Sequence, residues 1–336
     1  MKLLTISIAA YNAEATLKKC LDSMVGSKYV NNIEILVIND GSKDGTLFIA
    51  QDYKRRFPES VVIIDKQNGG HGSTINVGIN VATGLFFKTV DADDWVETDG
   101  LDKLIEELSV EVDLFVNPYY EVDAKTLDKK EKKVFDQSLR QGIIYESKDC
   151  ISKTTIAMHA MTIRTSILKE MNLKIDEKCF YVDMEYILFP LPYIKQIKFL
   201  KFAVYDYLLG TATQSMNLEV FINRRGQHEK VLKRLYDFYN SITEREKNLC
   251  YANVIKKRIV AATYIQYRIL LMLPPKIGEN EIKKFDSFVP DIIFEGVSGN
   301  TKRLLKYFRK VNYKNYQLII TVLQRCKIIK KDGDIL

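Results

Sequence analysis

The sequence contains little of several features that mark common protein classes. Its 336 residues include one tryptophan, seven prolines and five cysteines. The cysteines form no CxxC pair, which argues against a zinc site or a redox dithiol, and we expect reduced thiols; they are Cys20, Cys150, Cys179, Cys250 and Cys326. No run approaches the roughly 20 uncharged apolar residues that span a bilayer. Met1 leads directly into LLTISIA without the basic start of a signal peptide, so we expect a cytoplasmic protein.

Acidic residues are missing from one long stretch of the chain. Residues 301–331 contain ten Lys/Arg and no Asp/Glu, and residues 219–336 hold 24 of the 50 basic and 12 of the 43 acidic residues. Such a surplus favours an anionic neighbour, and the apolar residues between the basic ones suit peripheral contact with the inner face of the cell membrane. A helix packed on its own domain with a solvated basic face would show the same pattern. No DNA- or RNA-binding motif is present, so nucleic acid is not expected.

The first 110 residues alternate between strand and helix patterns. Short apolar runs predict buried strands at 3–9, 33–39, 61–65 and 85–90. Apolar residues at helical spacing predict helices near 17–25, 46–57, 73–82 and 98–108. This alternation indicates an α/β fold with a mostly parallel sheet and helices on both faces. Ligands of such sheets bind beyond the carboxyl ends of the strands.

Each of the four strands is followed by a polar cluster, in the order AAYNAE, NDGSKDG, QNGGHGST and DADDW. Because the carboxyl ends of parallel strands share one edge of the sheet, the four loops should meet at one crevice. The last loop places Asp91, Asp93 and Asp94 within four positions, where their charges repel one another. A Mn²⁺ or Mg²⁺ ion would relieve this repulsion and stabilise a departing diphosphate. A solvated turn is the alternative interpretation.

Three segments, in this order and spacing, resemble the family 2 glycosyltransferases of the GT-A fold, of the type that builds bacterial cell-surface polysaccharides and glycoconjugates. They are the loop after the first strand, the loop at 39–42 and DADDW, and the resemblance extends over about residues 1–215. It implies a GT-A (Rossmann-like) domain at 1–218 that binds a nucleotide sugar and catalyses transfer. It also implies a nucleotide site and a metal site: the nucleotide would contact Ala9, Tyr11, Glu14, Asp40, Asn76 and Asp91, and the metal Asp93 and Asp91.

The family also implies a catalytic base farther along the chain. In CFYVDMEYILF, Asp183 matches this position, with Val182 in place of the usual preceding acid. Its carboxylate would take the proton of the acceptor hydroxyl in an inverting transfer. Four further residues would lie near the donor sugar or the acceptor, namely Asp94, His159, Gln214 and Ser215.

The expected reaction is the transfer of one hexose or N-acetylhexosamine. The donor would be a nucleotide sugar, UDP-linked by expectation, and the acceptor a glycan, lipid-linked or protein-linked hydroxyl. Because Trp95 is the only tryptophan, the QxxRW motif of processive membrane synthases is absent, which favours one sugar per encounter.

Structural roles remain open for several of these residues. Tyr11 would also suit the core, and Glu14 the positive end of a helix. Asp40 would also suit a turn, and Asp183 a helix N-cap. His71 would contact an anion at a helix start or serve the structure alone. The functional alternative is a non-catalytic domain that binds a sugar nucleotide and assists another glycosyltransferase. ATPase and dinucleotide-binding functions are not favoured, because the loop QNGGHGST fits neither a GK[ST] nor a GxGxxG motif.

Beyond residue 218 the patterns are helical. Candidate helices lie at 219–242, 246–273, 279–288, 300–311 and 315–330, with the PP pair at 274–275 as a break. We therefore expect a smaller all-helical C-terminal domain at 219–336.

Overall fold

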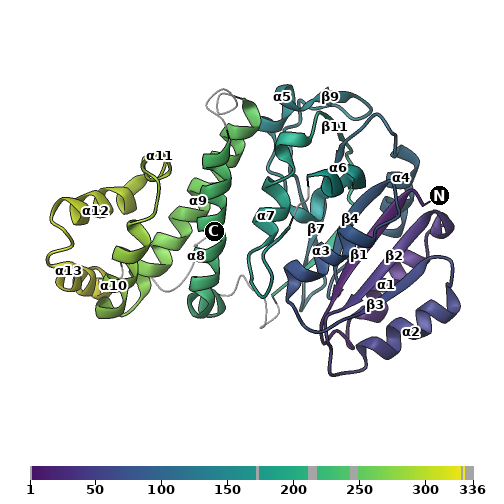
Figure 1. Cartoon of the computed structure of the whole chain (residues 1–336), viewed down its shortest axis with the longest axis horizontal. Coiled ribbons are helices and arrows are strands. Elements are labelled where there is room, and N and C mark those ends of the chain that lie inside the picture. The colour runs from purple at the N-terminus through teal and green to yellow at the C-terminus, as the bar shows by residue number, and fades with distance from the viewer. Residues whose placement is uncertain (1, 172–173, 211–217, 243–248, 327, 330–336) are drawn as a thin grey trace. The chain divides into compact units, whose positions relative to one another are not determined.

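The computed structural model describes residues 2–171, 174–210, 218–242, 249–326 and 328–329 (Figure 1). By its internal contacts the chain divides into two compact units, Met1–Ala212 and Thr213–Leu336. Among the described residues, every strand lies in the first unit, and the regular elements of the second unit are helices. No helix among the described residues is long and apolar enough to cross a membrane.

An eight-stranded sheet forms the centre of the first unit, in the order β3-β2-β1-β4-β10-β6-β11-β9. Its first four strands run parallel to one another. They are β1 (Leu4–Ala10), β2 (Ile33–Asn39), β3 (Val61–Asp65) and β4 (Phe86–Asp91). Every residue of β2 is buried, and β1 and β4 are nearly so, as expected for strands covered on both faces. The predicted α/β fold with a mostly parallel sheet is confirmed.

The remaining strands are short and were not expected from the sequence. The central sheet continues through β10 (Met161–Arg164), β6 (Leu114–Val116), β11 (Gln196–Phe199) and β9 (Ile144–Glu146). A second sheet has the order β5-β12-β7-β8. It comprises β5 (Trp95–Val96), β12 (Tyr205–Leu209), β7 (Tyr119–Asp123) and β8 (Lys129–Lys132). Because β5 directly follows DADD and pairs with β12, this sheet fixes the fourth loop of the predicted site.

Helices connect the parallel strands as predicted. They are α1 (Leu17–Val25), α2 (Thr46–Arg56), α3 (His71–Val81) and α4 (Thr98–Glu107). Helix α1 contacts α2 and α4, whereas α3 contacts α6 (Thr165–Glu170). Helix α3 begins two residues before the predicted start, because Gly70 adopts a positive φ of 81° and turns the chain into the helix. The shorter elements of the unit are α5 (Ser147–Cys150), α7 (Asp183–Leu188), η1 (Val30–Asn32), η2 (Ile151–Lys153), η3 (Met158–Ala160) and η4 (Leu191–Tyr193).

The second unit is helical, as expected. It contains α8 (Leu218–Ser241), α9 (Cys250–Met272), α10 (Pro275–Asp286), α11 (Asp291–Phe294), α12 (Gly299–Lys310) and α13 (Tyr316–Arg325). Helix α9 contacts α8, α10, α11 and α12, so it forms the centre of the unit. Helix α10 begins at Pro275 and not at 279, because a proline at the first helical position lacks only an N–H that would have had no partner.

Candidate active site

The loops after β1 and β2 are tied to each other. Asn12, with a φ of 49°, donates its backbone N–H to Ser42 Oγ (3.0 Å) and accepts at Oδ1 from the N–H of Lys43 (2.8 Å). Glu14 Oε2 accepts from the N–H of Gly45 (3.0 Å). These bonds make the first two loops one structural unit at the carboxyl end of the sheet. The Glu14 carboxylate therefore supports the second loop.

Tyr11 and Ala9 lie beside this unit. Tyr11 is 54% exposed, so the core role considered for it is wrong. Its ring is accessible for stacking on a planar ligand. Ala9 is half-buried near the end of β1, where it pairs in register with Asp91 of β4.

Asp40 is a buried carboxylate that holds the third loop. Its side chain is 3% exposed and accepts hydrogen bonds from Lys66 Nζ (2.6 Å), the N–H of Gly69 (2.9 Å) and the N–H of Gly70 (2.8 Å). Lys66 also donates to Ser73 Oγ of α3 (2.9 Å). A charge removed from water needs such partners. In this structure Asp40 thus fixes the start of α3, and its predicted contact with a nucleotide stays a prediction.

Asn76 anchors a distant segment to α3. Its Oδ1 accepts from the N–H of Ile175 (2.8 Å), and its Nδ2 donates to the carbonyl of the same residue (2.9 Å). Gly72 allows the close approach, since a Cβ there would lie 2.0 Å from the carbonyl oxygen of Asp176. The Asn76 side chain therefore has a structural role. It holds the segment that leads to Asp183 against α3, next to the third loop QNGGHGST.

The DADD loop divides its carboxylates between solvent and the interior. Asp91 Oδ1 lies 2.9 Å from His71 Nε2. Asp93 is exposed, whereas Asp94 is 2% exposed. Asp94 accepts from the Tyr205 hydroxyl at Oδ2 (2.6 Å) and from the N–H of Leu208 at Oδ1 (2.8 Å). Because both partners of Asp94 lie on β12, the loop is a fixed element and not a freely solvated turn.

The electrostatics of the loop reflect crowded negative charge. Burial, followed by the charges of Asp91 and Asp93, raises the pKa of Asp94 well above its usual range. Desolvation by the surrounding protein and the charge of Asp91 also raise the pKa of the exposed Asp93. Burial opposes ionisation of Asp91 as well, but the charge and hydrogen bond of His71 outweigh it and lower the pKa of Asp91. A nearby cation would relieve this crowding.

His71 responds to the same charges in the opposite sense. Burial works against its protonation, but Asp91, Asp183 and Asp93 together raise its pKa. His71 is the first residue of α3, where backbone N–H groups favour anions. The raised pKa of His71 and the backbone N–H groups together make the start of α3 more positive than it would be with a histidine of ordinary pKa.

Asp183 is the first residue of α7, and solvent reaches it. The N-cap residue is Val182, and no side chain caps the helix, so the N-cap role considered for Asp183 is wrong. Desolvation by the surrounding protein raises the pKa of Asp183, while His71 acts in the opposite direction and Asp91 adds to the rise. The predicted base therefore shares one electrostatic environment with the DADD loop.

His159 lies among three tyrosine rings. Its ring stacks on that of Tyr207, with centroids 4.3 Å apart, and contacts the rings of Tyr205 (4.8 Å) and Tyr119 (5.2 Å). Its Nδ1 is buried without a hydrogen-bond partner among the described residues. Burial is the main cause that lowers the pKa of His159 to about 4, so the imidazole is neutral at pH 7. One ligand atom of this residue lies within 4.8 Å of ligand atoms of both Asp91 and Asp94.

Several other side chains that shape the site were not predicted. Lys88 is fully buried on β4 and donates to the carbonyls of His159 (2.7 Å) and Met161 (3.2 Å). Burial lowers the pKa of Lys88 to about 7. Tyr205 and Lys66 likewise act through contacts with residues distant in the chain. Gln214 and Ser215, predicted near the acceptor, lie outside the described residues.

Comparison with known proteins identifies the family. A model described as "Glycosyl transferase family 2" matches residues 5–171. Residues 5–171 of the chain belong to glycosyl transferase family 2. The glycosyltransferase GlyA of Streptococcus pneumoniae is 35% identical over 118 residues, which are 35% of this chain and 17% of GlyA. EpsH of Bacillus subtilis is 34% identical over 127 residues, or 37% of this chain and 36% of EpsH. The match therefore spans 36% of the length of EpsH and 17% of the length of GlyA.

Solved structures resemble a larger part of this family 2 protein. Residues 1–349 of Staphylococcus aureus TarS, in complex with UDP-GlcNAc, superpose with a TM-score of 0.65 and 18% identity, covering 97% of this chain and 92% of that one. The mannosyltransferase PcManGT of Pyrobaculum calidifontis, with GDP-Man and Mn²⁺, gives a TM-score of 0.50 at 11% identity, covering 98% and 88%. At these identities the likeness establishes a shared fold, which is the predicted GT-A type.

Proposed function

We propose that this family 2 protein is an inverting glycosyltransferase that moves one hexose or N-acetylhexosamine from a nucleotide sugar to an acceptor hydroxyl. The observation that carries the proposal is the grouping of Asp91, Asp93 and Asp183 around His71, at the carboxyl end of β4. Two of these carboxylates come from one loop and the third from a helix more than 80 residues later. Such convergence is what a metal-assisted transfer with a separate base requires.

In the proposed reaction, the acceptor oxygen attacks the anomeric carbon from the face opposite the diphosphate. The new carbon–oxygen bond forms as the bond between the anomeric carbon and the diphosphate oxygen breaks. The electron pair of the breaking bond leaves with the nucleoside diphosphate. The hydroxyl proton passes to the carboxylate of Asp183. The raised pKa of Asp183 suits this role, because a stronger base accepts the proton more readily. A single displacement inverts the configuration and needs no covalent sugar–enzyme intermediate.

The DADD loop fits a divalent cation. Its carboxylate oxygens are hard ligands, and Asp91, Asp94 and His159 bring ligand atoms within 4.8 Å of one another. We propose Asp91 and Asp93 as the ligands of Mn²⁺ or Mg²⁺, with Asp94 and His159 nearby. Asp91 belongs to this group of three, whereas Asp93 does not and is proposed from the resemblance of DADDW to the family motif. When bound, the ion would offset the negative charge of the departing diphosphate. The Mn²⁺ complex of PcManGT supports this choice.

His71 and Tyr11 are proposed to contact the donor. His71, with its raised pKa at the start of α3, would face the diphosphate. The exposed ring of Tyr11 would stack on the base, next to Ala9. Glu14, Asp40 and Asn76 would shape the nucleotide site through the loops that they hold. A uridine donor is the proposal supported by the UDP-GlcNAc complex of TarS.

The acceptor is proposed to be a glycan, lipid-linked or protein-linked hydroxyl. We assign donor binding and catalysis to residues 1–218 and acceptor or membrane contact to residues 219–336. The basic surplus of that part supports work in the cytoplasm at the inner face of the membrane.

Release of nucleoside diphosphate tests the proposal. The full chain is incubated with Mn²⁺ and, in turn, UDP-, GDP- and dTDP-sugars, and diphosphate is quantified with and without a mixture of glycan acceptors. We expect release from one nucleotide class that stops when the metal is chelated. Thermal stabilisation by a nucleotide sugar without release would instead point to the non-catalytic binding role. Neither release nor stabilisation with any donor would refute the proposal.

A further inference from the structure

An exposed apolar pair lies on α13 between basic side chains. Leu318 is 68% exposed and Val322 is 49% exposed. They are one helical turn apart and therefore lie on the same side of the helix. Lys314 lies before the start of α13, on the far side of its N-cap residue Asn315, and Arg325 is the last residue of the helix. We call these four side chains the α13 stripe.

Packing within the second unit does not account for the stripe. The apolar side chains that this unit needs from α12 and α13 are buried, and they are Leu305, Phe308, Tyr316 and Ile320. Helix α12 therefore packs its apolar side chains within its own unit. Leu318 and Val322 remain exposed, and exposure of apolar surface to water is unfavourable.

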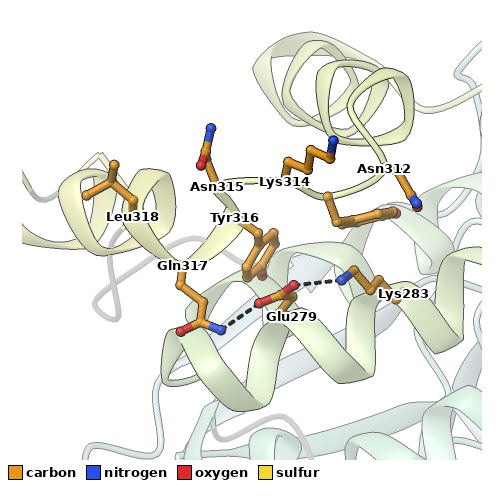
Figure 2. Close-up of a pocket in the computed structure, with 9 residues that line it drawn as sticks. Glu279, Lys283, Asn312, Lys314, Asn315, Tyr316, Gln317 and Leu318 are labelled. Carbon is orange, nitrogen blue, oxygen red and sulfur yellow. Dashed lines mark hydrogen bonds and ion pairs between the residues drawn. The ribbon is translucent and has the colours of Figure 1, made fainter.

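A pocket of about 300 Å³ adjoins the stripe (Figure 2). It is lined by Glu279 and Lys283 of α10 and by residues 312–318. The negative charge of Glu279 is matched, because its two oxygens accept from Lys283 Nζ (2.6 Å) and Gln317 Nε2 (2.7 Å). Figure 2 shows the side chains of Lys314 and Asn315 extending away from α10. The pocket thus has an unmatched lysine at its edge.

The pocket also adjoins the first turn of α13. The backbone N–H groups of Gln317 and Leu318 have no acceptor within the described part of the chain. Such groups at a helix start favour an anion. Together with Lys314, they offer a charge and directed donors to one phosphate group.

This part of the chain carries an excess of basic side chains. Four basic side chains form no ion pair with another described residue, namely Arg303, Lys310, Lys314 and Arg325, whereas Lys302 and Lys306 are paired with Glu295. No acidic residue occurs between 301 and 331. A surface of this charge attracts anionic lipid over the distance of a Debye length.

We infer that the α13 stripe and its pocket form a binding site for anionic phospholipid in a membrane. A headgroup phosphate would occupy the pocket beside Lys314 and the first turn of α13, while Leu318 and Val322 enter the apolar boundary of the leaflet. A soluble anion would leave the apolar pair unexplained. Two apolar side chains are also too few for a protein interface, which buries about 800 Å² per partner. This site lies in the second unit and does not depend on the proposed transfer reaction.

Sedimentation with vesicles tests the inference and requires neither donor nor metal. The full chain is mixed with vesicles of phosphatidylcholine alone, or of phosphatidylcholine and phosphatidylglycerol in equal parts, at low and at high salt. We expect retention only on the anionic vesicles, weakened by salt. Lys314→Glu should reduce partitioning about thirtyfold, since each charge contributes roughly 1 kcal/mol and reversal changes two. Leu318→Ser combined with Val322→Ser should reduce it more than tenfold.

Matched substitutions on the first unit provide the controls. Lys125→Glu and Val110→Ser alter an exposed lysine and an exposed apolar residue there, and should leave retention unchanged. Thermal melting shows that each variant is folded. Absence of wild-type retention on anionic vesicles would overturn the inference, as would equal losses in the stripe variants and the controls. Stabilisation by inorganic phosphate without vesicle retention would also overturn it, by assigning the pocket to a soluble anion.

Discussion

Replacement of Asp40 by alanine tests whether this carboxylate holds the third loop of the site. The substitution removes the acceptor for Lys66 Nζ and for the N–H groups of Gly69 and Gly70. Breaking a buried ion pair costs about 3–5 kcal/mol, and a buried N–H left without an acceptor about 1–3 kcal/mol. Lys66 is 21% exposed and keeps a bond to Ser73 Oγ, which moderates the first cost. We therefore expect the unfolding free energy to fall by about 4 kcal/mol.

Urea unfolding followed by the fluorescence of Trp95 measures this loss. Trp95 is the only tryptophan and is 8% exposed in the first unit, so its signal reports the unfolding of that unit. Asp65→Ala is the control, because exposed Asp65 ends the neighbouring strand and accepts one bond from Asn39 Nδ2 (2.7 Å). It should cost no more than about 1 kcal/mol. A loss in Asp40→Ala as small as in the control would refute the structural role of Asp40.

Two further predictions concern buried polar groups in each unit. The Tyr205 hydroxyl donates to Asp94 at 2.6 Å, so Tyr205→Phe should lower the unfolding free energy by about 2 kcal/mol in the same assay; an unchanged urea midpoint would contradict this. Burial lowers the pKa of His228 to about 4, although its hydrogen bond with Gln266 acts to raise the pKa. This histidine is therefore neutral in the folded protein between pH 6.5 and 4 and takes up a proton on unfolding in that range. Stability of the second unit should fall by about 3 kcal/mol between pH 6.5 and 4. Calorimetry across this pH range should show this fall in stability in the wild type and not in His228→Leu. The same fall in the variant would be evidence against His228 as its cause.

The parallel half of the sheet was predictable because its strands are buried on both faces. Such strands are continuous apolar runs, which stand out from their polar flanks. The second sheet offered no such signal, since β8 is the fully exposed segment KKEK and β5 has two residues. Their pairing depends on contacts between distant parts of the chain, which periodicity does not reveal.

The residues of the candidate site also differ in how far the sequence reveals them. The carboxylates of the DADD loop and Asp183 were visible as motifs, because the family resemblance singles out acidic residues at these places. Tyr205 was not predictable, because it donates its hydrogen bond to Asp94 from 111 positions away and belongs to no motif in the sequence. The internal role of Asp40 was likewise hidden, because its partner Lys66 looks like a surface lysine in the sequence.

The division of labour between the DADD loop and Asp183 is tested most directly by measuring UDP binding and sugar transfer in parallel. UDP affinity is determined by calorimetry with and without Mn²⁺, and transfer in single turnovers. In Asp183→Asn, we expect UDP affinity to stay near that of the wild type while transfer falls about a hundredfold to ten-thousandfold. In Asp93→Ala, binding should lose its dependence on Mn²⁺. Equal loss of binding in both variants, or undiminished transfer by Asp183→Asn, would contradict the account.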